Sequence, residues 1–518
     1  MLNQVEYELT EEQSKIVNTI KDGAPLVKIN AFAGTGKTFT LVEVSKYFLN
    51  KKVLYIAFNK AIQLEAKEKF DACVAVKTTH SLAYSGLYGF MKQARVKKGD
   101  YKNIEIAEMF NVDYKTASLI LTIFNAYCNS GAKTISEDDT SDSIAKSYAI
   151  QLFTKMANNE IEITHSFYLK LYQLKLLEGA IRKHYDLVLL DEAQDTNDVT
   201  LSIFYSISAT QRVVVGDRHQ QIYSFRGGVN AIAKIKAELF HLTKSFRFNQ
   251  LIANKATEFL KTFKKEKLSL KGSSNSSVSL FPENEVYIAR TNSRLIDTMS
   301  SLLDNGCMFK TIREPYLIFG LALNVLALNN GEELDKGYSY LYKFIKLYEE
   351  DAMTSDMNRL DFLINLAEET EDIELLMACK IAQKYEYSLN ELYEIANEFY
   401  NSKDEASIFL TTAHTAKGLE WEKATVLNDF NITKQIAKYF IDKNRLKENN
   451  FLEAFLEDMS VQGRIKQTII DELNLYYVAI TRAKKILVDE TEMEILDNDK
   501  NKINQKIFKI IKDQTEDI

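Results

Sequence analysis

Proline and glycine, the residues that interrupt helices, are scarce in this chain. Its 518 residues include 3 prolines and 18 glycines, well below the average usage of about 5% and 7%, which favours long helices. No stretch of about 18 apolar residues exists, which excludes an ordinary membrane-spanning helix. The first residues also lack the basic and apolar regions of a signal peptide. We therefore expect a helix-rich, cytoplasmic protein with no membrane partner.

The chain also has few cysteines and no net positive charge. The four cysteines, Cys73, Cys128, Cys307 and Cys379, are too far apart in sequence to form a CxxC pair. This spacing excludes a metal or redox motif of that kind and predicts reduced core thiols. The 65 basic and 72 acidic side chains give a net charge of −7, whereas a small protein that coats DNA is strongly basic. Any contact with nucleic acid must therefore be local, or must depend on stacking and backbone groups.

Short apolar runs alternate with helical segments in two parts of the chain. Such alternation is typical of parallel strands joined by helices in βαβ units. The predicted strands are residues 26–30, 53–57, 186–190 and 213–216 in the first part, and residues 278–281, 285–290, 408–411, 424–428 and 486–489 in the second.

The stretches between these runs predict the domain organisation. Residues 90–180 and 312–404 have a helical pattern without short apolar runs, so we expect an α/β protein of two domains, each interrupted by a mainly helical insertion. The predicted first domain comprises residues 1–89 and 181–248 around the insertion 90–180, and the predicted second domain comprises residues 249–311 and 405–518 around the insertion 312–404.

The first chemical motif is AFAGTGKT, which follows a predicted strand and precedes a predicted helix. Gly34 and Gly36 allow a tight backbone whose N–H groups face phosphates. Lys37 suits the β- and γ-phosphates, and the Thr38 hydroxyl suits Mg²⁺. A chance glycine-rich turn is the alternative, and the strand–helix context disfavours it. The predicted ATP contacts in this loop are Ala31, Phe32, Ala33, Gly34, Thr35, Gly36, Lys37 and Thr38.

The second motif is the sequence DEAQD at residues 191–195, directly after a predicted buried strand. A carboxylate at the end of such a strand can hold Mg²⁺ beside the hydroxyl of the phosphate loop. We assign that role to Asp191, and we expect Glu192 to orient and deprotonate the attacking water. An acidic helix N-terminus, favoured by the helix dipole, is the alternative interpretation. The nearby phosphate loop favours the catalytic one.

These two motifs belong to an ordered series along the chain. Together with the segments given below, they resemble the motifs of superfamily 1 helicases of the UvrD/Rep type, and the order as well as the sequences agrees. The segments AFAGTGKT, YIAFNKAI and KTTHSLAY also look like the F-box DNA helicase branch, although no F-box is expected because the family's adenine-reading motif, LTEEQS with Gln13, begins near residue 9. The further segments are Gln13 in LTEEQS, residues 57–60, 78–81, 215–227, 245–247, 412–420 and 477–483.

The resemblance implies two RecA-like P-loop domains that clamp ATP and Mg²⁺ between them. It also implies 3′→5′ movement on single-stranded DNA or at single-strand/duplex junctions. The implied catalytic residues are Lys37, Asp191, Glu192, Gln220, Arg247 and Arg482, with Thr38 and Asp191 as the Mg²⁺ ligands. Gln220 would sense the γ-phosphate, and the Arg247 and Arg482 guanidinium groups would stabilise the charge of phosphoryl transfer. The implied ATP contacts outside the loop are Gln13, Phe246, Arg247, Glu420 and Arg482. Gln13 matches the glutamine that reads adenine, and Phe246 stands where a tyrosine often stacks on adenine. The implied DNA contacts are Phe58, Asn59, Thr79, His80, Tyr223, Phe225, Arg226 and His414.

Purely structural roles are the alternative for several of these residues. For Arg247 and Arg482 the alternative is a surface ion pair, which their place in the motifs disfavours. For each aromatic residue the alternative is a position in the core, as for many of the 29 Phe and 27 Tyr. Departures from the family pattern are modest: Phe225 replaces the usual Trp, Phe246 a frequent Tyr, Ala479 a Gly, and Arg218-His219 an acidic pair.

The sequence therefore predicts an ATP-dependent 3′→5′ DNA helicase, with DNA repair, recombination control or anti-phage defence as the expected setting. Two alternatives stay open. One is a motor that strips proteins from single strands without unwinding duplex DNA. The other is a nucleotide-dependent subunit of a larger complex, which the intact Glu192, Gln220, Arg247 and Arg482 disfavour.

Overall fold

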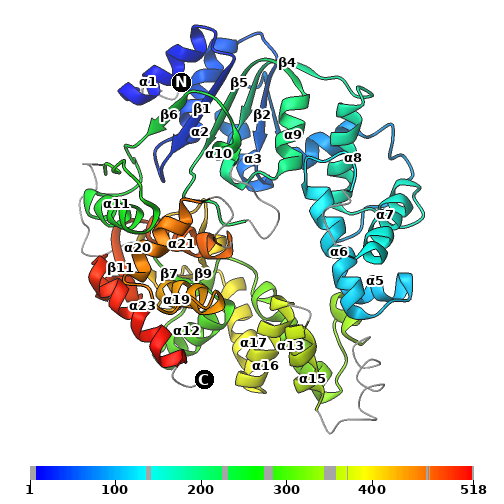
Figure 1. Cartoon of the computed structure of the whole chain (residues 1–518), viewed down its shortest axis with the longest axis vertical. Helices are drawn as coiled ribbons and strands as arrows, with labels where there is room; N and C mark the ends of the chain where they lie inside the picture. The colour runs from blue at the N-terminus through cyan, green and yellow to red at the C-terminus, as the bar shows by residue number, and fades with distance from the viewer. Residues whose placement is uncertain are drawn as a thin grey trace.

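The computed structural model describes residues 8–135, 142–223, 231–273, 284–342, 358–369, 372–461, 465 and 467–515. The described strands form two parallel sheets flanked by helices, which confirms the predicted α/β fold class. Figure 1 shows the two sheets and the two groups of inserted helices arranged in a ring, with the first sheet at the top and the second at the lower left. The predicted strand 278–281 lies outside the described residues.

The first sheet has six strands in the order β3-β2-β4-β5-β1-β6, and all neighbouring strands are parallel. Its inner strands are buried apolar runs, as expected for a parallel sheet covered on both faces. The sequence pattern did not predict the edge strands β3 and β6, which carry polar residues such as Lys77 and His241. The strands are β1 (Leu26–Ala31), β2 (Val53–Ala57), β3 (Val74–Thr78), β4 (His184–Leu190), β5 (Ser208–Gly216) and β6 (Leu239–Leu242).

Helices connect these strands, and four of them form an inserted group between β3 and β4. The inserted helices lie within the stretch predicted to be helical, and their buried side chains share one hydrophobic cluster with strand residues such as Leu54 and Val188. The connecting helices are α1 (Glu11–Lys21), α2 (Lys37–Ser45), α3 (Lys60–Lys69), α4 (Thr79–Gly86), α9 (Asp198–Ser206) and α10 (Ala231–Lys234). The inserted helices are α5 (Asn103–Phe110), α6 (Tyr114–Asn129), α7 (Ser143–Ala157) and α8 (His165–Leu177).

The second sheet has five strands in the order β11-β10-β7-β9-β8, again all parallel. Strand β10 begins at Trp421 and ends at Val426, so the prediction of a strand over 424–428 was wrong at both ends. The chain leaves the sheet at Leu427, which is followed by a short turn. The remaining strands are β7 (Glu285–Ala289), β8 (Lys310–Thr311), β9 (Ile408–Thr412) and β11 (Ala483–Asp489).

The helices of the second half also fall into a connecting group and an inserted group. The connecting helices are α11 (Gln250–Lys264), α12 (Asn292–Asp304), α18 (Ala413–Ala416), α19 (Ile432–Asp442), α20 (Phe451–Met459), α21 (Gln467–Ile480), α22 (Glu492–Leu496) and α23 (Lys500–Thr515). The inserted helices, between β8 and β9, are α13 (Tyr316–Asn330), α15 (Arg359–Glu369), α16 (Ile373–Tyr385) and α17 (Ser388–Asn401).

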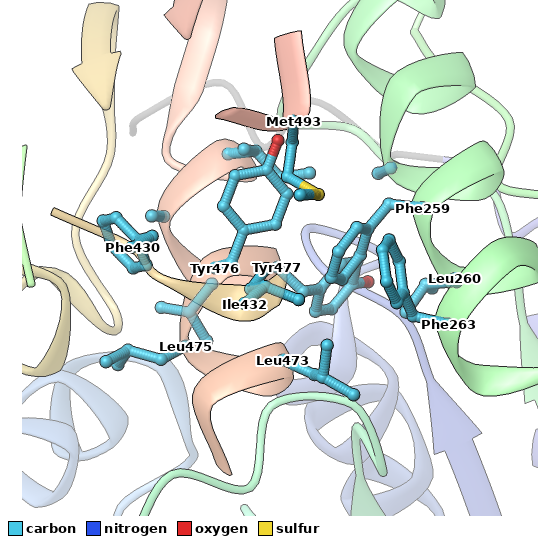
Figure 2. Close-up of a cluster of buried hydrophobic side chains, with 14 of the residues drawn as sticks. Phe259, Leu260, Phe263, Phe430, Ile432, Leu473, Leu475, Tyr476, Tyr477 and Met493 are labelled. Atoms are coloured by element: carbon cyan, nitrogen blue, oxygen red, sulfur yellow. The ribbon is translucent and has the colours of Figure 1, made fainter. Parts of the chain in front are cut away.

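Helix α21 lies at the centre of the largest hydrophobic cluster, which Figure 2 shows. The ring of Tyr476 packs against Phe259 of α11 and Phe430, with ring centroids 4.7 Å and 5.9 Å apart. The next residue, Tyr477, is also fully buried, and its hydroxyl group reaches Asp217 of the first domain at 3.3 Å. The helix that organises the second core therefore also touches the segment that follows β5.

The two groups of inserted helices contact each other on the side of the ring opposite the domain junction (Figure 1). The Lys102 ammonium group lies over the Tyr340 ring, 5.6 Å from its centroid. Ile104 and Tyr114 of the first group share a buried cluster with Leu375 of the second. Among the helices of the described ranges, none has both the length and the apolar character that a membrane crossing requires.

Candidate nucleotide site and the adjoining aromatic surface

The phosphate loop joins β1 to α2, and its glycines are required by the backbone. Gly34 and Gly36 have φ of 72° and 78°, in the left-handed region that other residues avoid. A Cβ atom on Gly34 would lie 2.5 Å from the Ser245 Oγ atom and 2.6 Å from the Arg247 Cβ atom. The loop therefore packs directly against the segment that leads into the second domain. Its end is the N-terminus of α2, where backbone N–H groups favour an anion.

The predicted catalytic side chains of the first domain converge beside this loop. The Lys37 Nζ and Glu192 Oε1 atoms form an ion pair at 2.7 Å, and the Thr38 hydroxyl donates to Asp191 Oδ2 at 3.2 Å. The Tyr55 hydroxyl, from β2, donates to the same carboxylate oxygen at 2.6 Å. Lys37 and Thr38 are more than 150 positions from Asp191 in sequence, yet the parallel strands β1 and β4 end at the same edge of the sheet.

Burial and charge set the ionisation of this cluster. Burial works to lower the pKa of Lys37, but the Glu192, Asp191 and Asp217 carboxylates outweigh it and raise the pKa above its ordinary value. Burial works to raise the pKa of Glu192, but the Lys37 and Lys417 ammonium groups outweigh it and lower the pKa. Lys37 is therefore a cation neutralised by an ionised Glu192.

The donor set at this point suits a magnesium ion. Mg²⁺ prefers oxygen ligands and is usually held by one or two protein groups together with substrate phosphates and water. The Thr38 hydroxyl and the Asp191 carboxylate are such ligands, already adjacent at the edge of the phosphate loop. Within the described ranges, no cluster of three or more His, Cys, Asp or Glu residues suggests an all-protein metal cage. The residues present therefore fit a phosphate-bound ion.

The segment 217–221 carries the predicted γ-phosphate sensor. The Gln220 amide donates to Asp217 Oδ2 at 2.7 Å, and the Gln220 carbonyl accepts from the Lys417 ammonium at 2.7 Å. Lys417 also pairs with the buried carboxylate of Asp195. Burial raises the pKa of Asp195 to about 6, although the Lys417 charge opposes the rise. Lys417 belongs to the second domain, so these contacts connect the sensor across the domain junction.

Three further predicted ATP contacts form a network at the domain junction: Arg247, at the end of the predicted first domain, and Glu420 and Arg482 of the second. The Arg247 Nε atom is 2.8 Å from Glu420 Oε2, and Lys484 pairs with the other oxygen of Glu420 at 2.8 Å. Arg482 is 1% exposed and donates to the carbonyl groups of Val478 at 2.8 Å and Leu419 at 3.2 Å. For the predicted role, the Arg482 guanidinium must exchange these carbonyl groups for phosphate oxygens.

The residues predicted to hold the adenine lie at one end of the loop. Gln13 is buried, closes the N-terminal capping box of α1 with Thr10, and donates to the Thr40 hydroxyl at 3.3 Å. A Cβ atom on Gly36 would be 3.2 Å from Gln13 Nε2 and 3.7 Å from the Phe246 ring. Phe246 is 50% exposed, and the Lys244 ammonium lies 5.6 Å from its ring centroid, so a base that stacks on this ring would also meet a cation.

Several predicted DNA contacts form an aromatic surface next to the sensor. The Phe58 and Tyr223 rings are stacked with centroids 5.4 Å apart, and the Tyr223 hydroxyl donates to the His414 carbonyl at 3.3 Å. The Lys417 ammonium lies 5.5 Å from the Tyr223 ring centroid. The Asn59 side chain instead caps α3, accepting from the Ile62 N–H at 2.9 Å. Tyr223 is thus three residues from the sensor Gln220 and on the same segment.

The other predicted DNA contacts lie elsewhere. Thr79 and His80 begin α4, and the His80 ring contacts His165 and Tyr168 of α8 rather than the Phe58–Tyr223 pair. Phe225 and Arg226 lie outside the described residues, so their assignments stay predictions.

Four residues of the site were missed at the level of sequence. The sequence did not indicate a functional role for Tyr55, because a tyrosine in an apolar strand resembles any other core residue. Asp217 and Lys417 were inside recognised motifs but had no assigned role. Tyr477, also inside a motif, links the two domains: its hydroxyl contacts Asp217 and accepts from the Ala33 N–H at 3.3 Å.

Comparison with known proteins agrees with this geometry. Residues 122–241 match the model of the UvrD/REP helicase N-terminal domain. F-box DNA helicase 1 of Gallus gallus is 28% identical over 95% of this chain and 50% of its own length. F-box DNA helicase protein 1 of Schizosaccharomyces pombe is 30% identical over 93% of this chain and 57% of its own length. A probable DNA helicase II homolog of Mycoplasma genitalium is 23% identical over 95% of this chain and 86% of its own length.

The chain thus spans about half the length of the F-box relatives that it matches. The comparisons confirm the resemblance that the motifs predicted: the chain contains a segment matching the UvrD/REP helicase N-terminal domain and is similar along nearly all of its length to F-box DNA helicases and a DNA helicase II homolog.

Proposed function

We propose that the protein is an ATP-driven motor that moves 3′→5′ along single-stranded DNA and unwinds duplex DNA ahead of it. The observation that carries the proposal is the continuous path from phosphate loop to aromatic surface. Lys37, Thr38, Asp191 and Glu192 converge at one point, and the segment from Asp217 to Tyr223 leads from there to the stacked rings. The names of the relatives, each a DNA helicase, support the same activity.

The nucleotide cycle follows from the contacts of the phosphate loop. Thr38 and Asp191 would hold a Mg²⁺ ion, which would supply positive charge beside the phosphates of ATP, as it does in P-loop enzymes. Lys37 exchanges its present partner, Glu192, for the β- and γ-phosphates. This exchange frees the Glu192 carboxylate to orient a water molecule and to accept its proton. The ion pair at 2.7 Å therefore keeps the Glu192 carboxylate bound to Lys37 until the phosphates of a nucleotide take its place on Lys37.

Coupling to DNA depends on the contacts that the segment 217–223 makes with the second domain. Asp217 contacts Tyr477, the Gln221 carbonyl accepts from the Asn474 amide at 2.7 Å, and Tyr223 contacts His414. Any movement of the second domain toward a γ-phosphate therefore pulls on the same segment that presents the Tyr223 ring. Stacking of a base on such a ring contributes about 1–3 kcal/mol and tolerates any sequence.

The 3′→5′ direction rests on the resemblance to UvrD/Rep-type motors, and a strand-displacement assay tests it. We expect the protein to separate a duplex with a 3′ single-stranded tail and to leave a duplex with a 5′ tail intact, only with ATP and Mg²⁺. The Glu192→Gln variant should bind both ATP and DNA without separating strands. Glu65→Gln, which removes an exposed ion pair with Lys69 on α3, is the matched control and should behave like the parent.

The outcomes separate the competing interpretations. Separation of only the 5′-tailed duplex would contradict the proposed direction. Rapid DNA-stimulated hydrolysis with no strand separation would favour a motor that displaces bound proteins, which displacement of a labelled protein from single-stranded DNA would then measure. Slow hydrolysis without stimulation by DNA would favour a nucleotide-dependent subunit instead.

A further inference from the structure

A group of large aromatic side chains is exposed on α4 and on the turn that follows it. Tyr84, Tyr88 and Phe90 are 51%, 74% and 50% exposed. Scattered exposed rings are common on protein surfaces, but contiguous apolar patches mark interaction sites. These three residues lie within seven positions of one another and next to His80, which is exposed at the start of the same helix. We call His80, Tyr84, Tyr88 and Phe90 the aromatic ladder.

The spacing of the ladder places its first two members on one helix face. His80 and Tyr84 are four residues apart in α4, which puts their side chains about 6 Å apart on the same face. Tyr88 and Phe90 lie in the turn that follows Gly86, where the Leu87 N–H donates to the Ala83 carbonyl at 2.9 Å and the Met91 N–H donates to the Leu87 carbonyl at 3.1 Å. The ladder therefore begins on α4 and continues into the turn after it.

Helix α8 holds two members of the ladder. The Tyr168 ring makes edge contacts with His80 and Tyr84, at centroid distances of 5.9 Å and 5.7 Å. The Tyr168 hydroxyl is 2.9 Å from His165 Nδ1, which fixes the supporting ring. The His80 and Tyr84 rings, held in this way, lose little conformational freedom on binding, so a base can stack on them at a low entropic cost.

The charge around the ladder suits a polyanion. Residues 72–99 contain the basic residues Lys77, Lys92, Arg95, Lys97 and Lys98 and lie between Asp71 and Asp100, with no other Asp or Glu, although the whole chain has a net charge of −7. Lys97 pairs with Glu105 at 2.9 Å, and Asp100 is close enough to His80 to act on its charge. Lys92, Arg95 and Lys98 are exposed. The Lys175 ammonium lies 5.8 Å from the Phe90 ring centroid, and it also pairs with Glu178. Aromatic rings beside cations are the combination that binds single strands without sequence preference.

The ladder continues the proposed DNA surface. Strands β2 and β3 are neighbours in register, with Ala57 opposite Thr78. Phe58 and Thr79 therefore leave the sheet side by side, and His80 is the next residue. We propose that the aromatic ladder binds single-stranded DNA, extending the strand path from the Phe58–Tyr223 pair along α4 toward the first group of inserted helices. The inference rests on the proposed function, because it lengthens the DNA path of that motor.

The test compares the binding of short and long oligothymidylates to the intact protein. The parent affinity should rise with oligonucleotide length until the ladder is covered and should then level off. Tyr88→Ala should bind the long oligonucleotide at least about fivefold more weakly while it binds the shortest one like the parent. Tyr88→Phe should restore binding of the long oligonucleotide, because it keeps the ring. Tyr387→Ala, which removes a ring of matching exposure (73%) on the second inserted group, is the control.

Each outcome decides the proposal. Parent-like binding of the long oligonucleotide by Tyr88→Ala and by the Tyr84→Ala, Tyr88→Ala double variant would overturn the ladder. The proposed function would then stand, provided that DNA still stimulates the parent ATPase. Equal loss for short and long oligonucleotides would overturn it as well, since the ring would then act on the core site or the fold. If Tyr88→Ala weakened only the binding of blunt duplex DNA, the ladder would bind duplex DNA instead of a single strand, and the proposal would be overturned. A parent that binds no DNA would overturn the proposed function and the ladder together.

Discussion

The clearest structural prediction concerns Glu266, a buried acid that joins the two domains. Its side chain is 2% exposed and follows α11 of the second domain. One carboxylate oxygen accepts from Arg218 and lies 2.7 Å from His219 Nε2. The other accepts from the N–H groups of Lys267 at 2.8 Å and Leu268 at 3.0 Å. Arg218 and His219 lie between Asp217 and Gln220, so Glu266 anchors the sensor segment from the side opposite Lys417.

Glu266→Gln should destabilise the protein without changing side-chain volume. A hydrogen bond to a charged group contributes about 1.5–3 kcal/mol, and removal of one partner from a buried pair costs about 3–5 kcal/mol. The glutamine amide oxygen still accepts from the Lys267 and Leu268 N–H groups, but its NH₂ group then faces the Arg218 guanidinium, which can only donate. We therefore expect a loss of about 2–4 kcal/mol in the free energy of unfolding.

The effect should depend on pH with a defined sign. Burial works to raise the pKa of Glu266, but its hydrogen bonds with His219 and Arg218 outweigh it and hold the pKa well below the ordinary value. A depressed carboxyl pKa contributes stability above the unfolded-state pKa, about 4.3 for Glu, and that stability is lost as the pH falls below it. The difference between parent and Glu266→Gln should therefore be constant near neutral pH and should shrink below about pH 4.

Urea unfolding followed by circular dichroism at several pH values measures both effects. Glu65→Gln, which removes an exposed ion pair with Lys69, is the control and should cost at most about 1 kcal/mol. A loss for Glu266→Gln no larger than that of the control would refute the reasoning. A difference that grows as the pH falls would also refute it, because it would have the opposite sign.

Three further predictions address the nucleotide and DNA sites. Gly34→Ala should abolish nucleotide binding, because its Cβ would meet Ser245 and Arg247. Gly23→Ala is the control: Gly23 also has a positive φ, 93°, but nothing lies within 4 Å of its Cβ position, and equal nucleotide affinity of the two variants would contradict the steric argument. Arg482→Ala should lower kcat by about 10³ or more with a smaller effect on ATP affinity; unchanged single-turnover chemistry would instead indicate a structural arginine. Phe225→Ala should weaken single-strand binding about 5- to 150-fold while Phe225→Trp is tolerated; a folded variant that binds like the parent would contradict stacking.

The sequence predicted the parts of the site that local chemistry defines. Lys37 and Thr38 follow a glycine-rich turn, and Asp191 follows an apolar strand, so the rule that parallel strands end at one edge brings them together. The fold class followed from the same alternation of runs and helices. The edge strands β3 and β6 were missed because polar residues interrupt their apolar pattern.

The contacts across the domain junction could not be predicted from the sequence. Lys417 and Asp195 stand in separate motifs, and nothing local to either one indicates that they pair. The same holds for Tyr477 with Asp217 and for Glu266 with His219. These pairings depend on how the two domains pack, which is set by side chains distributed over both cores. The exposure of Tyr84 and Tyr88 was equally hidden, because a helix pattern does not reveal which face remains uncovered.

The central claim, that an ATP-hydrolysing site is coupled to a DNA surface, is tested most directly by ATPase rates with and without single-stranded DNA. We predict that the parent hydrolyses ATP slowly alone and much faster with oligothymidylate. Lys37→Ala should be inactive in both conditions, because the ammonium group that contacts the phosphates is gone. A parent rate that DNA leaves unchanged, or a Lys37→Ala variant that hydrolyses ATP like the parent, would contradict the account.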